Sequence, residues 1–186
     1  MAAKIEPLLT IEDLDACPDD GNRYELIGGE LFVSRAPRIP HQRVVQNVQK
    51  AILNYLDQNP VGIMVPGAGA VFSEYDAVIP DLVFARNERW AEIVSEGRFV
   101  GGPDIVIEVL SPGAENRRRD LSVKRQLYGK YGVQEYWVVD SENHTVEIFR
   151  LTRGALESVA ALTDEDEISS PILPGFKLKV RAVFNF

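Results

Sequence analysis

The stretch that most constrains the fold is residues 104–110, DIVIEVL, which is rich in β-branched side chains and about one strand long. The two-residue period of a strand divides it into two mostly apolar faces: Ile105, Ile107 and Val109 on one, and Asp104, Val106, Glu108 and Leu110 on the other. A strand that is apolar on both faces usually lies inside a sheet covered on both sides. Glu108 is therefore predicted near the middle of a buried strand.

A buried carboxylate is costly unless it is paired with a cation or binds a metal. Glu108 is such a group, and a second run of the same character precedes it. In residues 80–84, PDLVF, Asp81 opens an otherwise apolar strand. The two acids therefore predict a cationic partner or a metal close to them.

The segment after the second run, residues 117–131, is predicted to be a basic helix. Asp120 is a plausible cap or first-turn acid, and Gly132 is a plausible stop. Side chains spaced three, four and three apart line one face of it: Leu121, Lys124, Tyr128 and Tyr131. Lys124 thus belongs to the face that should contact the sheet.

The remaining pattern predicts a single α/β (α+β) domain over residues 1–186, with a mixed central sheet flanked by helices. A β-α-β crossover leads from residues 104–110 through the basic helix to a buried strand at 135–140. Further helices are predicted at 11–16, capped by Thr10, and at 41–58. Two hairpins, at 24–34 across Gly28 and Gly29 and at 145–161, are expected at the sheet edges, and a last strand at 176–180.

Two carboxylates at strand ends with a nearby lysine suit metal-assisted hydrolysis of a phosphodiester. Asp81 and Glu108 would hold a divalent cation such as Mg²⁺, which prefers oxygen ligands. The cation lowers the pKa of a bound water and stabilises charge on the phosphate. Lys124 can orient the water or neutralise the developing charge.

The order strand–PD, strand–acid and helix resembles the PD-(D/E)xK nuclease superfamily, whose fold is restriction-endonuclease-like. Asp81 matches the aspartate of the PD motif and Glu108 the second acid. The usual lysine would lie two residues after that acid, where this chain has Leu110. A branch of small stand-alone proteins, the Uma-type restriction endonuclease family, shows the same departure, with the lysine moved to the following helix as Lys124 would be here.

Nearly the whole chain is similar to that family, through four segments: YELIGGELFVS, PHQRVV, RRRDLSVKRQLYGKYGVQEYWVVD and SSPILPGFKLKV. The resemblance implies a metal-dependent endonuclease acting on nucleic acid, with DNA as the expected substrate. It implies Mg²⁺ or Mn²⁺ held by Asp81 and Glu108, with the backbone carbonyl of Val109 as a further ligand, and Lys124 as the catalytic lysine. Related small nucleases often pair to cut two strands, so a homodimer is expected.

The residues expected to contact nucleic acid are Arg117, Arg118, Arg119 and His41. The three arginines would clamp phosphates, although a solvated helix start is an equal interpretation. His41 lies near the start of its helix. Its side chain either faces the nucleic acid or the site, or has a structural or capping role. The net charge of −8 argues against a DNA-binding protein, but the cluster of basic residues at 117–130 offers a local patch.

Two other function classes compete with the nuclease. In a non-catalytic binding module with the same fold, Lys124 would form a surface ion pair with Asp120, and an arginine such as Arg119 would neutralise Glu108. A metal-free hydrolase would use Asp81 and Glu108 as acid and base.

Three smaller expectations concern the environment of the chain and its first hairpin. The single cysteine, Cys17, suggests a reducing cytoplasm, and no apolar run is long enough for a membrane helix. In the first hairpin, Glu25 and Glu30 are expected to be exposed strand residues rather than site residues.

Overall fold

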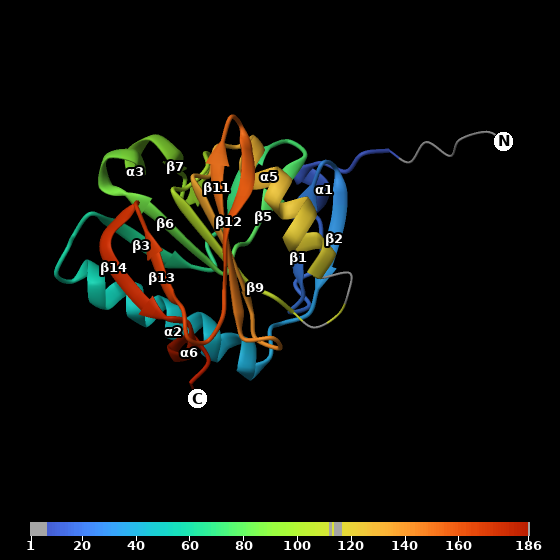
Figure 1. The fold of residues 1–186 in the computed structure, drawn as a ribbon. Helices are drawn as coiled ribbons and strands as arrows, with labels where there is room; N and C mark the ends of the chain where they lie inside the picture. The colour runs from blue at the N-terminus through green and yellow to red at the C-terminus, as the bar shows by residue number, and fades with distance from the viewer. Residues whose placement is uncertain (1–6, 112, 114–116, 186) are drawn as a thin grey trace.

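The computed structural model describes residues 7–111, 113 and 117–185, so part of the connection between residue 110 and the basic helix lies outside the described residues (Figure 1). A central six-stranded sheet carries the predicted crossover. Its strands, in spatial order, are β12 (Ala155–Leu162), β11 (Thr145–Thr152), β10 (Glu135–Asp140), β9 (Ile105–Val109), β6 (Leu82–Arg86) and β3 (Gly62–Pro66). Only β9 and β10 run parallel in this sheet, while its other neighbouring pairs are antiparallel. The mixed sheet and its β11–β12 edge hairpin confirm the sequence prediction.

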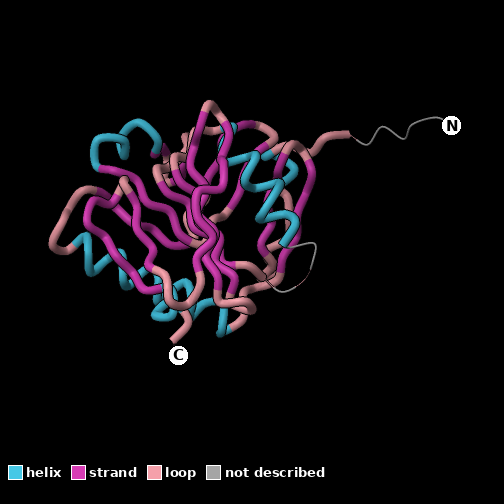
Figure 2. Tube along the Cα trace, in the orientation of Figure 1, coloured by secondary structure: helices cyan, strands magenta, loops and turns pink. Residues whose placement is uncertain are grey.

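Both faces of β9 are buried, as the sequence predicted. Every residue of β9 and β10 is buried. Ile105, Ile107 and Val109 share one apolar cluster with the inner side of α2 (Ile39–Leu56), whereas Val106 shares the opposite cluster with Leu127 of α5 (Arg125–Lys130). Figure 2 shows the helices on the outside of the strands. Glu108 therefore lies on the side of the sheet that α5 covers.

A second six-stranded sheet was not predicted as a unit. Its spatial order is β2 (Glu30–Ser34), β1 (Arg23–Ile27), β5 (Asp76–Val78), β4 (Ala70–Ser73), β8 (Arg98–Phe99) and β7 (Val94–Ser95). The predicted β1–β2 hairpin is confirmed, and its turn needs glycine because Gly28 and Gly29 have φ of 60° and 77°. Since β1 pairs with both β2 and β5, it is an internal strand of this sheet rather than an edge of the central one.

The basic helix differs from the predicted regular α-helix. Its residues 119–124 form a π-helix, η1 (Arg119–Lys124), before α5 continues to Lys130. Insertions of this kind occur often at functional sites. The hydroxyl of Tyr136 donates to the backbone carbonyl of Asp120 at 3.0 Å, which gives this irregular segment a partner from β10. Gly132, with φ of 80°, follows the end of the helix as predicted.

The remaining elements are α1 (Ile11–Asp15), α3 (Asn87–Ile93), the hairpin of β13 (Glu167–Ser170) and β14 (Leu173–Lys179), and α6 (Val180–Val183). Thr10 is the N-cap residue of α1, as predicted, and Asp13 accepts from its backbone N–H at 2.8 Å. The sequence predicted one terminal strand where the structure has a hairpin. Within the described part of the chain, no helix is long and apolar enough to cross a membrane.

Candidate active site

The two predicted acids meet because of the register between β6 and β9. Leu82 pairs with Ile107 in this antiparallel ladder, so Asp81, one residue before β6, lies level with Glu108. The backbone N–H of Val109 donates to Oδ2 of Asp81 at 2.9 Å and fixes the carboxylate at the end of β9. Asp81 and Glu108 are only 6% and 4% exposed.

Asp81 is held between an arginine and a histidine side chain. Nη1 of Arg23, on β1, lies 3.2 Å from Oδ1, and Nε2 of His41, on α2, lies 3.1 Å from Oδ2. Burial alone would raise the pKa of Asp81, but the hydrogen bonds from His41 and from the N–H of Val109 outweigh it and lower the pKa. Asp81 is therefore ionised at neutral pH.

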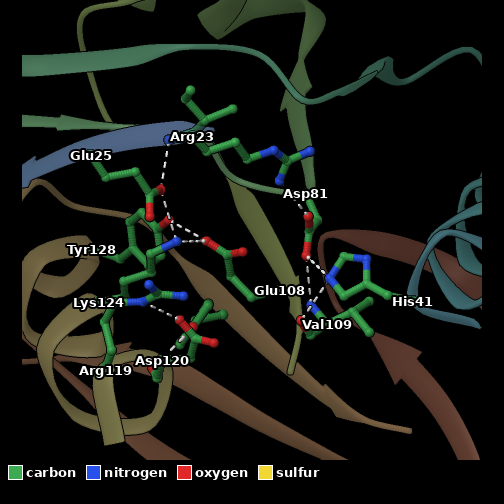
Figure 3. Close-up of polar contacts among 12 residues, drawn as sticks. Arg23, Glu25, His41, Asp81, Glu108, Val109, Arg119, Asp120, Lys124 and Tyr128 are labelled. Carbon is green, nitrogen blue, oxygen red and sulfur yellow. Dashed lines mark hydrogen bonds and ion pairs between the residues drawn. The ribbon is translucent and has the colours of Figure 1, made fainter. Parts of the chain in front are cut away.

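His41 faces the site from the first turn of α2 and does not cap that helix, whose N-cap residue is Arg38. Its Nε2 also lies 2.9 Å from the carbonyl oxygen of Val109. Both partners are acceptors, so Nε2 carries the hydrogen, while the buried Nδ1 has no hydrogen-bond partner among the described residues. His41 thus ties together Asp81 and the Val109 carbonyl, two groups that the sequence assigned to the metal (Figure 3).

Lys124 lies at the centre of the site. Its Nζ donates to Oε1 of Glu108 at 2.8 Å and to Oε1 of Glu25 at 2.9 Å, and the residue is 2% exposed. The alternative in which Lys124 forms a surface ion pair with Asp120 is therefore wrong. Burial alone would lower the pKa of Lys124, but the carboxylates of Glu108, Glu25 and Asp120 raise it, so the amine stays charged.

Glu108 is buried between a lysine and a tyrosine. Its Oε1 accepts from Lys124 and from the hydroxyl of Tyr128, each at 2.8 Å, so Arg119 is not its hydrogen-bond partner. Burial outweighs the attraction of Lys124 and raises the pKa of Glu108 to about 8. Figure 3 shows its other oxygen turned toward Asp81.

Glu25 is a site residue that sequence reasoning missed, because it was expected to be an exposed strand residue. It is 3% exposed, and its Oε1 also accepts from the backbone N–H of Ile79 at 2.9 Å. Glu25 is buried because β1 is an internal strand of its sheet, and the face of β1 that carries Glu25 is covered by η1. The signal that could have found it is the one that identified Glu108: an acid inside a short apolar strand. Glu30, by contrast, is exposed as predicted.

The three predicted arginines lie in different surroundings. Arg117 pairs with Asp140 and, with it, lines a separate cavity beside Leu110. Arg118 is exposed, whereas Nε of Arg119 turns inward and bonds Oδ1 of Asp120 at 3.2 Å. Asp120 is a first-turn acid, as expected, and it is also buried against the site, where burial raises its pKa.

A small cavity joins these side chains, with a volume of about 30 Å³. That is room for about one or two water-sized species. Its lining includes Arg23, Glu25, Ser34, Arg35, Pro37, His41, Ile79, Asp81, Glu108, Val109, Ser111, Arg119, Asp120 and Lys124. Carboxylate and carbonyl oxygens are the ligands that Mg²⁺ prefers, so the donor set of Asp81, Glu108 and Val109 fits such a cation. Among the described residues, however, no group of three or more His, Cys, Asp or Glu side chains is arranged to hold a metal.

The chain resembles known proteins in sequence and in fold. The model of the Uma2 family, described as "Putative restriction endonuclease", matches residues 11–181. A crystal structure from Anabaena variabilis, described as "a putative nuclease belonging to DUF820", superposes with a TM-score of 0.76 at 18% sequence identity. The superposition covers 95% of this chain and 97% of that one, so the two share a fold. No curated protein matches the chain.

Proposed function

Because the chain belongs to the Uma2 family of restriction-endonuclease-like proteins, we propose that it is a divalent-metal-dependent endonuclease that hydrolyses phosphodiester bonds of nucleic acid, with DNA as the substrate. The observation that carries the proposal is the buried Lys124, whose Nζ lies 2.8 Å from Glu108 in the cavity that Asp81 also lines. Two acids and a charged lysine in one small space are the parts that this reaction requires.

In this proposal Asp81, Glu108 and the Val109 carbonyl hold Mg²⁺ or Mn²⁺. When bound, the cation lowers the pKa of a water and stabilises charge on the phosphate. Asp81 is already ionised and fixed by the N–H of Val109, whereas Glu108 must give up its proton to become a ligand. His41 keeps the Asp81 carboxylate beside the Val109 carbonyl, 2.9 Å from its own Nε2.

Lys124 has the role of a fixed positive charge. A general base needs a neutral amine, and the raised pKa of Lys124 keeps its amine protonated. The ammonium can instead donate hydrogen bonds to the attacking water or to phosphate oxygens as negative charge develops. Glu25 keeps the Nζ in place while Glu108 changes partners.

A second candidate is the non-catalytic module with this fold. It is favoured by the side-chain contacts that the acids already make with Arg23 and His41, at Asp81, and with Lys124, at Glu108. A buried network of this kind can serve a purely structural purpose. The two candidates differ in whether the acids bind a divalent cation.

The experiment that tests the proposal is calorimetric titration of Mn²⁺ and Mg²⁺ into the wild type, Asp81→Ala and Glu108→Ala. Loss of a residue that hydrogen-bonds to a metal ligand lowers the affinity for the metal by about 10–100-fold. We therefore expect loss of a ligand itself to lower that affinity by more than about 100-fold. Glu135→Gln is the matched control, since Glu135 is 1% exposed and pairs with Arg150 outside the cavity. Supercoiled plasmid and an RNA transcript then identify the substrate. No cation binding and no cleavage by the wild type would leave the non-catalytic module.

The affinity for Mn²⁺ should depend on pH through Glu108. Its pKa is raised to about 8, so below that pH the site must lose a proton to bind the cation. We expect the affinity to rise by up to about tenfold per pH unit from pH 6 toward 8 and then to level off. Calorimetry in buffers of different ionisation enthalpy measures the released proton. A flat profile, with no proton released, would show that Glu108 is already ionised or is not a ligand.

A further inference from the structure

The rim of the cavity carries a pair of arginines that the sequence did not single out. We infer that Arg23 and Arg35 are the residues that contact the phosphates of the substrate strand as it enters the site. This inference rests on the proposed function and names the side chains through which the protein would recognise nucleic acid.

The β1–β2 hairpin brings the two arginines together. Arg23 begins β1 and pairs with Ser34, the last residue of β2, so Arg35 follows directly beside it. Both side chains line the cavity that contains Asp81 and Glu108. The two cations therefore come from adjacent strand ends at one side of the site.

These arginines are accessible where the other lining cations are not. Arg35 is exposed and the side chain of Arg23 is 30% exposed. The side chain of Lys124 is 3% exposed between Glu25 and Glu108, and that of Arg119 is 12% exposed against Asp120. A phosphate approaching from solvent therefore meets Arg23 and Arg35 first.

The contact between Arg23 and Asp81 favours this assignment. Nη1 of Arg23 lies 3.2 Å from the Oδ1 of the carboxylate that would also bind a divalent cation, so guanidinium and cation would compete for Asp81. A guanidinium released from Asp81 stays at the mouth of the cavity, where its planar fork of donors matches phosphate oxygens. In a chain of net charge −8, phosphate binding must depend on a few local contacts of this kind.

The test compares the wild type with Arg23→Ala, Arg23→Lys and Arg35→Ala. Arg98→Ala is the matched control, because Arg98 is exposed and lies on β8, away from the cavity lining. Binding of a fluorescent DNA oligonucleotide is measured by anisotropy in Ca²⁺ over a range of salt concentrations. The affinity for Mn²⁺ without DNA is measured by calorimetry on the same proteins.

We expect Arg23→Ala and Arg35→Ala each to weaken DNA binding by about tenfold. Each should also make the plot of log affinity against log salt concentration shallower, reducing the magnitude of its negative slope by about 1. Arg23→Lys should fall between the wild type and Arg23→Ala, since a lysine keeps the charge without the fork. The Mn²⁺ affinity of Arg23→Ala should be equal to or higher than that of the wild type, because a competing cation has been removed.

Two outcomes overturn the inference while leaving the proposed function in place. Unchanged DNA affinity in Arg23→Ala and Arg35→Ala, with metal-dependent cleavage by the wild type, would show that the substrate is held elsewhere. Loss of Mn²⁺ affinity in Arg23→Ala would show that Arg23 only supports Asp81. Failure of the wild type to bind DNA or RNA would overturn both the inference and the proposed function.

Discussion

Replacing Lys124 with methionine should reduce phosphodiester cleavage by about 10²–10³-fold and lower the free energy of unfolding by about 3–5 kcal/mol. The loss of stability follows because Glu25, which is 3% exposed, would lose the ammonium that compensates its charge, and Glu108, which is 4% exposed, would lose a hydrogen-bond donor. The loss of activity follows because no other described lysine lines the cavity. Urea denaturation and a plasmid-nicking assay measure the two effects.

Lys130→Met is the matched control for this substitution. Lys130 ends α5 and pairs with Asp76 at 2.9 Å, but its side chain is 62% exposed. Asp76 is buried, but it also accepts from the hydroxyls of Ser73 and Tyr131 and from the backbone N–H of Gly28, so loss of the exposed ammonium should cost only about 1 kcal/mol and leave cleavage close to the wild type. Cleavage by Lys124→Met at the wild-type rate would remove Lys124 from the reaction, whatever its effect on stability.

Replacing Glu25 with alanine should reduce cleavage almost as much as removing Lys124, although Glu25 is not expected to touch substrate or metal. It is a positioning residue, because its Oε1 is anchored by the N–H of Ile79 and holds Nζ of Lys124, each at 2.9 Å. Without it, Glu108 is the one carboxylate hydrogen-bond partner that Lys124 keeps within the described part of the chain, and Glu108 is the group that must turn to a cation. We therefore expect a loss of about 10²-fold in kcat and a weaker affinity for Mn²⁺.

A double-mutant cycle distinguishes this role from a general loss of stability. If Glu25 acts through Lys124, the double variant Glu25→Ala/Lys124→Met should cleave no more slowly than Lys124→Met alone. Glu25→Gln should recover part of the rate, since its amide oxygen can still accept from Lys124 and Ile79. Glu135→Gln combined with Lys124→Met provides an additive reference. Additive effects of Glu25→Ala and Lys124→Met on kcat would contradict the positioning role.

The sequence by itself determined the burial of the two strands and the presence of acids in them. The two-residue period at 104–110 predicted a strand covered on both faces, and β9 packs against α2 on one side and α5 on the other. The same reasoning placed Lys124 on the inner face of the following helix. These predictions succeed because periodicity is local, and because burial follows directly from apolar side chains on both faces of a strand.

Only the tertiary structure decided which charges meet. Lys124 bonds Glu25, 99 positions away in the chain, and Asp81 bonds Arg23, 58 positions away. No local pattern encodes these pairs, since they depend on how the β1–β2 hairpin of the second sheet packs beside η1 and β6. Packing likewise gives Arg117 a distant partner, Asp140, 23 positions along the chain, whereas Arg119 bonds its sequence neighbour Asp120. A buried charge needs a partner, but only the packing of distant segments determines which residue that partner is.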